Sequence, residues 1–114
     1  MDTKDLADIF TKKALFEAVD NCEKELLSSQ NLSDASIFFK SLGKEDREIL
    51  LWMMKIVSFN VVSSFSSILS NMTSIFEEEL ELTTFQNEIL NEDELLNDYI
   101  INDASKEIWP ESAL

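Results

Sequence analysis

Between Ile49 and Met72 the chain carries one charged side chain, that of Lys55, and this stretch limits what the protein can fold into. A run of about 20 predominantly apolar residues is long enough to cross a membrane as a helix. Six serines and two asparagines interrupt the run, however, and the sequence after it is strongly acidic rather than basic. We therefore expect the core helix of a soluble domain here, and no membrane span.

The fold class follows from the scarcity of turn-forming residues. The 114 residues include one glycine and one proline, and none of the dipeptides that make tight β-hairpin turns. The prediction is an all-α fold, a small helical bundle that forms one domain over residues 1–114. Apolar and polar residues alternate at 79–83, as they do in a strand, so a short strand pair near residues 76–90 stays open as an alternative to helix there.

The first helix is predicted from about residue 2 to residue 28, with Asp2 or Thr3 as its cap. Its apolar residues recur at steps of three and four, but the residues before Thr11 point to a different side of the axis from those after Lys13. We therefore expect the helix to bend or break near residues 11–13.

Two further short helices are predicted from their boundary residues. One begins with Ser33 as its N-cap and ends at Gly43, a glycine in the position that follows a helix C-terminus. The other begins at Asn91 and ends near Asn102, and the tail after it contains no predicted element. We expect Trp109 to dock that tail as a hydrophobic plug, the alternative being an exposed anchor for a partner.

The central helix should change character along its length. Residues 49–54 are apolar in every direction around the axis, so that end should be enclosed. Further on, two stripes lie opposite each other. The apolar stripe is Val57, Val61, Phe65, Ile68 and Met72. The polar stripe is Asn60, Ser63, Ser64, Ser67, Asn71 and Ser74. The polar stripe is either a solvated face or a surface on which another helix, from this chain or a second subunit, packs closely.

Length adds a constraint on the central helix. A straight helix over residues 44–73 spans about 45 Å at 1.5 Å per residue, whereas a compact domain of this size is about 35 Å across. The helix must therefore bend, break near residues 58–60, protrude, or pair with another chain. We expect a homodimer on this ground.

Charge is concentrated in the last third of the sequence. Acidic residues outnumber basic ones 23 to 9, for a net charge of −14, and residues 77–114 hold 12 acids and one base. Such a chain repels nucleic acid and attracts basic proteins. The predicted partner-binding residues are Glu77, Glu78, Glu79, Glu81, Glu92, Asp93, Glu94 and Asp98.

The chain offers little chemistry. It has no histidine and a single cysteine, Cys22, which we expect to be a small buried apolar residue. Zinc sites and nucleophile–base pairs need these residue types, and no glycine-containing calcium loop is present. We expect no catalytic, cofactor or metal site, and no enzyme activity. The N-terminal residues lack the pattern of a signal peptide, which favours a cytoplasmic location.

These observations favour a small acidic, non-catalytic protein-binding module. A concrete version is an immunity protein, an antitoxin or a phage-type inhibitor that masks a basic protein surface. The alternative is a structural or assembly protein, a self-associating helical subunit of a larger complex.

Overall fold

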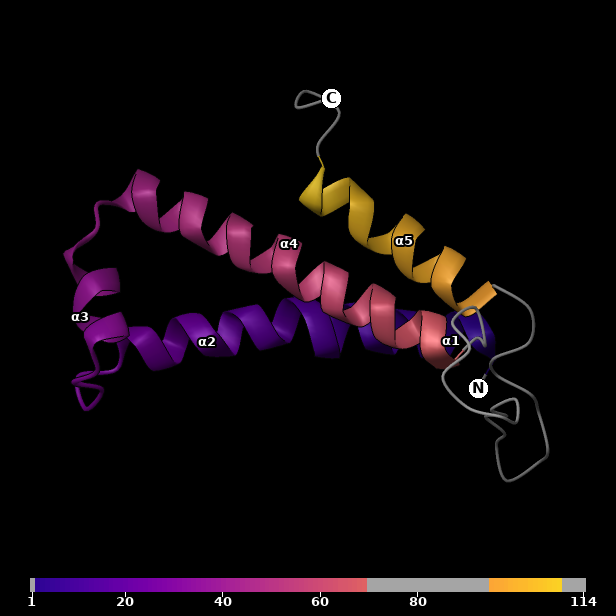
Figure 1. Cartoon of the computed structure of the whole chain (residues 1–114), viewed down its shortest axis with the longest axis horizontal. Coiled ribbons are helices and arrows are strands. Elements are labelled where there is room, and N and C mark those ends of the chain that lie inside the picture. The colour runs from indigo at the N-terminus through magenta and orange to yellow at the C-terminus, as the bar shows by residue number, and fades with distance from the viewer. Residues whose placement is uncertain (1, 70–94, 110–114) are drawn as a thin grey trace.

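The computed structural model describes residues 2–69 and 95–109, and every regular element in these two ranges is a helix. The elements are α1 (Thr3–Ile9), the π-helix η1 (Phe10–Glu17), α2 (Ala18–Leu27), α3 (Asp34–Ser41), α4 (Lys44–Leu69) and α5 (Leu95–Ile108). The all-α prediction is confirmed, and the strand pair near residues 76–90 lies outside the described residues. α1, η1 and α2 follow one another as a single rod, α3 joins this rod to α4, and α5 lies over α1 and α4 (Figure 1).

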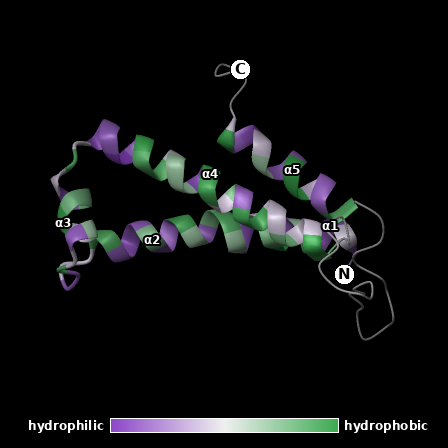
Figure 2. Ribbon diagram, in the orientation of Figure 1, coloured by the Kyte–Doolittle hydropathy of each residue, from purple (hydrophilic) through white to green (hydrophobic). Residues whose placement is uncertain are grey.

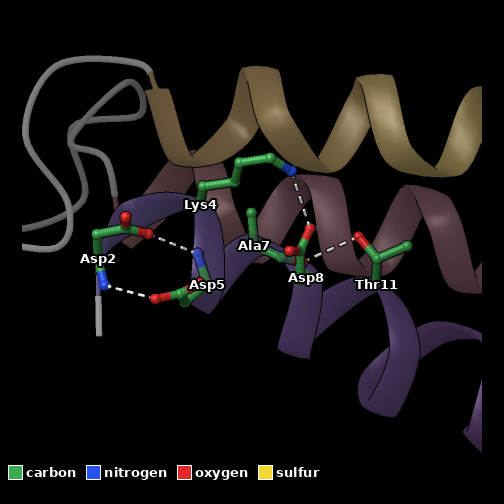
Figure 3. A network of polar contacts seen from close by, with 6 residues as sticks. All are labelled: Asp2, Lys4, Asp5, Ala7, Asp8 and Thr11. Atoms are coloured by element: carbon green, nitrogen blue, oxygen red, sulfur yellow. Dashed lines mark hydrogen bonds and ion pairs between the residues drawn. The ribbon is translucent and has the colours of Figure 1, made fainter.

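The rod begins with a reciprocal cap, as Figure 3 shows. The Asp2 carboxylate accepts a hydrogen bond from the backbone N–H of Asp5 at 2.9 Å, and the Asp5 carboxylate accepts one from the N–H of Asp2 at 3.1 Å. This capping box satisfies two N–H groups that have no partner within the helix. Of the two caps that the sequence allowed, Asp2 and Thr3, the structure has Asp2.

The predicted irregularity near residues 11–13 is a change of helix type. The chain stays helical there, but η1 has the wider turns of a π-helix. The residues that the rod buries on one side, Ala7, Thr11, Leu15 and Val19, are four apart. In a regular α-helix such a row drifts around the axis, because one turn takes 3.6 residues. The wider turns offset this drift and keep the row facing the core.

α3 begins at Ser33, whose hydroxyl accepts a hydrogen bond from the N–H of Ser36 at 3.2 Å, so the predicted N-cap is confirmed. Gly43 follows the end of α3, but its backbone is not in the left-handed region. Its carbonyl instead accepts the first hydrogen bond of α4, from Arg47 N–H at 3.0 Å. The single glycine thus follows the C-cap residue Leu42 of α3, as the sequence predicted, and its carbonyl also begins α4.

α4 is one unbroken helix of 26 residues. At 1.5 Å per residue it is about 39 Å long, and the longest dimension of the chain is 49 Å. The break that the sequence allowed near residues 58–60 does not occur, and the helix extends along the molecule instead of bending to fit a compact shape. The last predicted residues of this helix, 70–73, lie outside the described ranges.

The main core lies where α5 meets α1, η1 and α4. Fully buried side chains project from α5 at every fourth residue: Leu96, Ile100, Ala104 and Ile108. They pack with Ala7 and Leu15 of the rod and with Val62 of α4. The expectation that no element follows Asn102 is wrong, because this four-residue period continues to Ile108 and holds the chain in a helix.

Two contacts fix α5 along α4. The Trp52 indole N–H donates a hydrogen bond to the carbonyl of Ile108 at 2.7 Å, and the rings of Trp52 and Trp109 meet edge to face, 6.2 Å apart. Trp109 therefore docks the end of α5 while remaining partly exposed. Toward the other end, the side-chain amide oxygen of Asn97 accepts hydrogen bonds from the hydroxyls of Ser66 at 2.5 Å and Ser63 at 3.3 Å.

The expectation of an enclosed apolar end on α4 is wrong. Ile49, Trp52 and Met53 are all exposed, and the buried residues of α4 are Val62 and Ser66 alone. Among residues 2–69 and 95–109, the rod and α5 pack on two sides of α4, and the remaining apolar side is exposed.

The two leucines at the start of α5 test this core. Leu96 is fully buried and Leu95 is 44% exposed. We expect Leu96→Ala to lower the free energy of unfolding by about 2–5 kcal/mol, and Leu95→Ala to lower it by less than about 1 kcal/mol. Urea unfolding followed by circular dichroism measures both, and equal losses would contradict the placement of α5.

Candidate interaction surface

The structure describes some of the residues that the sequence singled out. Of the predicted acidic partner-binding residues, Asp98 lies exposed in the first turn of α5. The others, Glu77, Glu78, Glu79, Glu81, Glu92, Asp93 and Glu94, lie outside the described ranges, as do Asn71 and Ser74 of the polar stripe. Asn60, Ser63, Ser64 and Ser67 are on α4.

α5 divides the polar stripe of α4. The Ser63 hydroxyl faces α5 and donates to Asn97, whereas Asn60 and Ser64 are exposed on the other side. Ser66, which the sequence placed in neither stripe, is fully buried against Asn97. Its hydroxyl also lies 2.9 Å from the backbone carbonyl of Ser63, so the buried hydroxyl of Ser66 is paired. This small polar cluster belongs to the fold itself.

The apolar stripe of α4 faces solvent. We define the outer face of α4 by Leu50, Met53, Val57, Val61, Phe65 and Ile68. Val57 and Val61 are each 63% exposed, Met53 is 54% exposed and Phe65 is 55% exposed, while the two end residues are half-buried. Figure 2 shows how little of the long α4 ribbon is strongly hydrophilic beyond its first turns. Four of its six residues, Val57, Val61, Phe65 and Ile68, belong to the apolar stripe that the sequence predicted.

The outer face is continuous with two hollows. One, of about 370 Å³, lies between α2 and α4, and the other, of about 500 Å³, lies along α4 itself. Val57 lines both. The first is also lined by Ala18, Val19, Cys22, Leu50, Met53, Met54 and Ser58, and the second by Asn60, Val61, Ser64, Phe65 and Ile68. Cys22 is a free, half-buried thiol that lines the hollow between α2 and α4, rather than a buried core residue.

No charged side chain belongs to the outer face. The only charged residue of α4 after Glu48 is Lys55, which points the other way and lies 5.8 Å from the centre of the Phe16 ring. An apolar surface of this kind is rare on a chain with a net charge of −14. Large exposed apolar patches mark sites of contact with proteins or membranes.

By length and composition α4 is also the one described helix that could cross a membrane. Its most apolar 18-residue segment has a mean hydropathy of 1.5, and 11% of that segment is buried. The core helix of a soluble protein passes the same test, so this finding alone does not separate the two environments. Within residues 2–69 and 95–109, no group of three or more His, Cys, Asp or Glu side chains is placed to hold a metal ion.

The charged cluster that the structure describes joins α1 to α5. The Lys4 ammonium lies 3.4 Å from Asp8, as Figure 3 shows, and 5.7 Å from the centre of the Tyr99 ring. A hydrogen bond between the carboxyls of Asp8 and Asp103 lowers the pKa of Asp8 and raises the pKa of Asp103, because the two acids share a proton. The hydrogen bond to Asp8 raises the pKa of Lys4. These side chains are largely exposed, so the cluster influences the stability of the fold from the protein surface and not from the core.

Comparison of the chain with protein-family models, with curated proteins and with solved structures finds no match. Any function must therefore be argued from the surface just described.

The Asp8–Asp103 pair predicts a pH effect on stability. Because folding raises the pKa of Asp103, its ionised form lowers the stability of the folded state at pH 7. This loss of stability disappears as the pH falls through that pKa. We expect Asp103→Asn, whose amide donates to Asp8 at any pH, to raise the unfolding midpoint at pH 7 by about 1–3 °C, and to have little effect near pH 4.

Asp98→Asn is the control, because Asp98 lies exposed on the same helix and loses the same charge. Thermal unfolding at the two pH values measures both variants. If both raise the midpoint equally at pH 7, the effect comes from the net charge of the chain and not from the shared proton.

Proposed function

We propose that the chain is a non-catalytic protein-binding module that binds its partner through the outer face of α4. The observation that supports this is the uncharged apolar face itself, on a helix whose other two sides are packed. Fully burying a side chain of this size contributes about 1.5–3 kcal/mol. Four residues that are half to two-thirds exposed therefore offer a substantial gain on association.

The same face argues for binding rather than catalysis. Its six side chains contain no group that titrates or acts as a nucleophile. Binding by apolar contact needs only shape and area, which this surface supplies together with the two hollows. The activity that we propose is therefore association.

Site-specific photo-cross-linking in cells tests the proposal. We expect a photoreactive amino acid in place of Val61 to form a discrete cross-link to a second polypeptide. The same amino acid in place of Leu32, which is 79% exposed in the segment between α2 and α3, should form none. The absence of a cross-link at residue 61, or identical patterns from the two positions, would contradict the proposal.

A second candidate function is the masking of a basic protein surface, as an immunity protein, antitoxin or phage-type inhibitor would do. The observation that favours it is the net charge of −11 over residues 77–114. Charge of this kind speeds encounter with a basic partner and contributes to specificity. This function and apolar contact through α4 are compatible, since one sets the rate of encounter and the other holds the complex.

Charge neutralisation tests this second function. A variant with four glutamates replaced by Gln should bind a basic nuclease domain, encoded by a neighbouring gene, at least about tenfold more weakly at low salt. The four residues are Glu77, Glu78, Glu79 and Glu81. The matched control replaces Asp20, Glu25, Glu45 and Glu48 by their amides, the same change in net charge elsewhere. Isothermal titration measures both, and equal affinities of the two variants would show that the acidic segment has no specific role.

A further inference from the structure

We infer that the partner of the outer face is a second copy of this chain, bound antiparallel about a twofold axis that passes α4 near residue 59. The inference rests on the proposed use of this face for binding. It adds the identity of the partner and the register of the two helices.

The spacing of the face supports a twofold axis. Leu50, Met53, Val57, Val61, Phe65 and Ile68 are separated by three, four, four, four and three residues, so the pattern reads the same in both directions. In a twofold interface, residue i of one copy contacts residue j of the other and j contacts i. Antiparallel pairing about residue 59 places Val57 opposite Val61, Met53 opposite Phe65, and Leu50 opposite Ile68.

The exposure of the face has the same symmetry. The two central residues are both 63% exposed, the next two are 54% and 55% exposed, and the outer two are half-buried. An apolar surface that matches its own reverse has the self-complementarity that a second copy needs.

Charge also favours a second copy over a membrane. Two chains of charge −14 repel each other, so they can approach only where no charge lies between them, and the outer face is such a place. Helices that lie on membrane surfaces are instead rich in Lys and Arg on their polar side, and anionic lipid repels an acidic chain. Full insertion of α4 would break the hydrogen bonds that join it to α5.

The area predicts a dimer of modest affinity. The four central side chains offer on the order of 100 Å² each, about half of the ~800 Å² per partner in a standard interface. The hollow between α2 and α4 extends the contact, since Val57 and Met53 belong to both. We expect dissociation in the micromolar range.

Sedimentation equilibrium of the full chain tests self-association. The mass should rise with concentration from 13.1 kDa toward twice that value. It should rise at lower concentration in 0.5 M than in 0.05 M NaCl, because salt screens the repulsion between the copies. Val57→Glu and Val61→Glu should each weaken the dimer more than tenfold, and Leu32→Glu should leave it within twofold of wild type. All three positions are exposed, so each variant should keep the wild-type unfolding midpoint at a concentration where the wild-type chain is monomeric.

Disulfide trapping tests the register. In a Cys22→Ser background, a mixture of Val57→Cys and Val61→Cys chains should form mainly the mixed disulfide under mild oxidation. Each variant alone should cross-link several-fold more slowly, because its Cα atoms lie too far apart across the axis. Preferential linking of each variant to itself would overturn the antiparallel register.

Other outcomes overturn the inference as well. One is a mass of 13.1 kDa at all concentrations up to about 1 mM, and another is binding of a monomeric chain to phosphatidylcholine vesicles that Val61→Glu abolishes. A cross-link from residue 61 to a different polypeptide, combined with a monomeric mass, would reject the second copy and leave the proposed function standing.

Discussion

The fold depends on the row of side chains that α5 projects at every fourth residue toward α1, η1 and α4. These residues, from Leu96 to Ile108, are fully buried, and they form the core together with the rod and Val62. Directional contacts near the two ends of the helix, Ser66 with Asn97 and Trp52 with the Ile108 carbonyl, hold α5 antiparallel to α4. Apolar burial thus supplies most of the stabilisation, and the hydrogen bonds set the register.

Much of the local structure could be predicted from the sequence, because it depends on neighbouring residues. The Asp2 and Ser33 caps act within one turn of their helix, and the change of apolar direction near Thr11 marks the π-helix. Gly43 was predicted just after the end of the second helix and lies there, and because α3 and α4 follow each other so closely it also begins α4.

The orientation of α4 could not be predicted, because its apolar residues surround the axis and periodicity alone cannot select the packed side. The packed side depends on Asn97, which is 31 residues from Ser66 in the sequence. The side-chain amide oxygen of Asn97 accepts a hydrogen bond from the Ser66 hydroxyl. Once α5 packs on that side, the stripe with the more regular apolar spacing is left in water. The candidate surface follows from this choice: the sequence contained its residues, and only the packing showed that they are exposed.

Both tryptophans of the chain, Trp52 and Trp109, lie where the end of α5 is held against α4. Fluorescence excited selectively in tryptophan therefore comes from this one place, and its emission spectrum reports whether the end of α5 is attached or detached. The outer face contributes no fluorophore of its own beyond Phe65. The protein thus contains an optical probe for the detachment of one helix end.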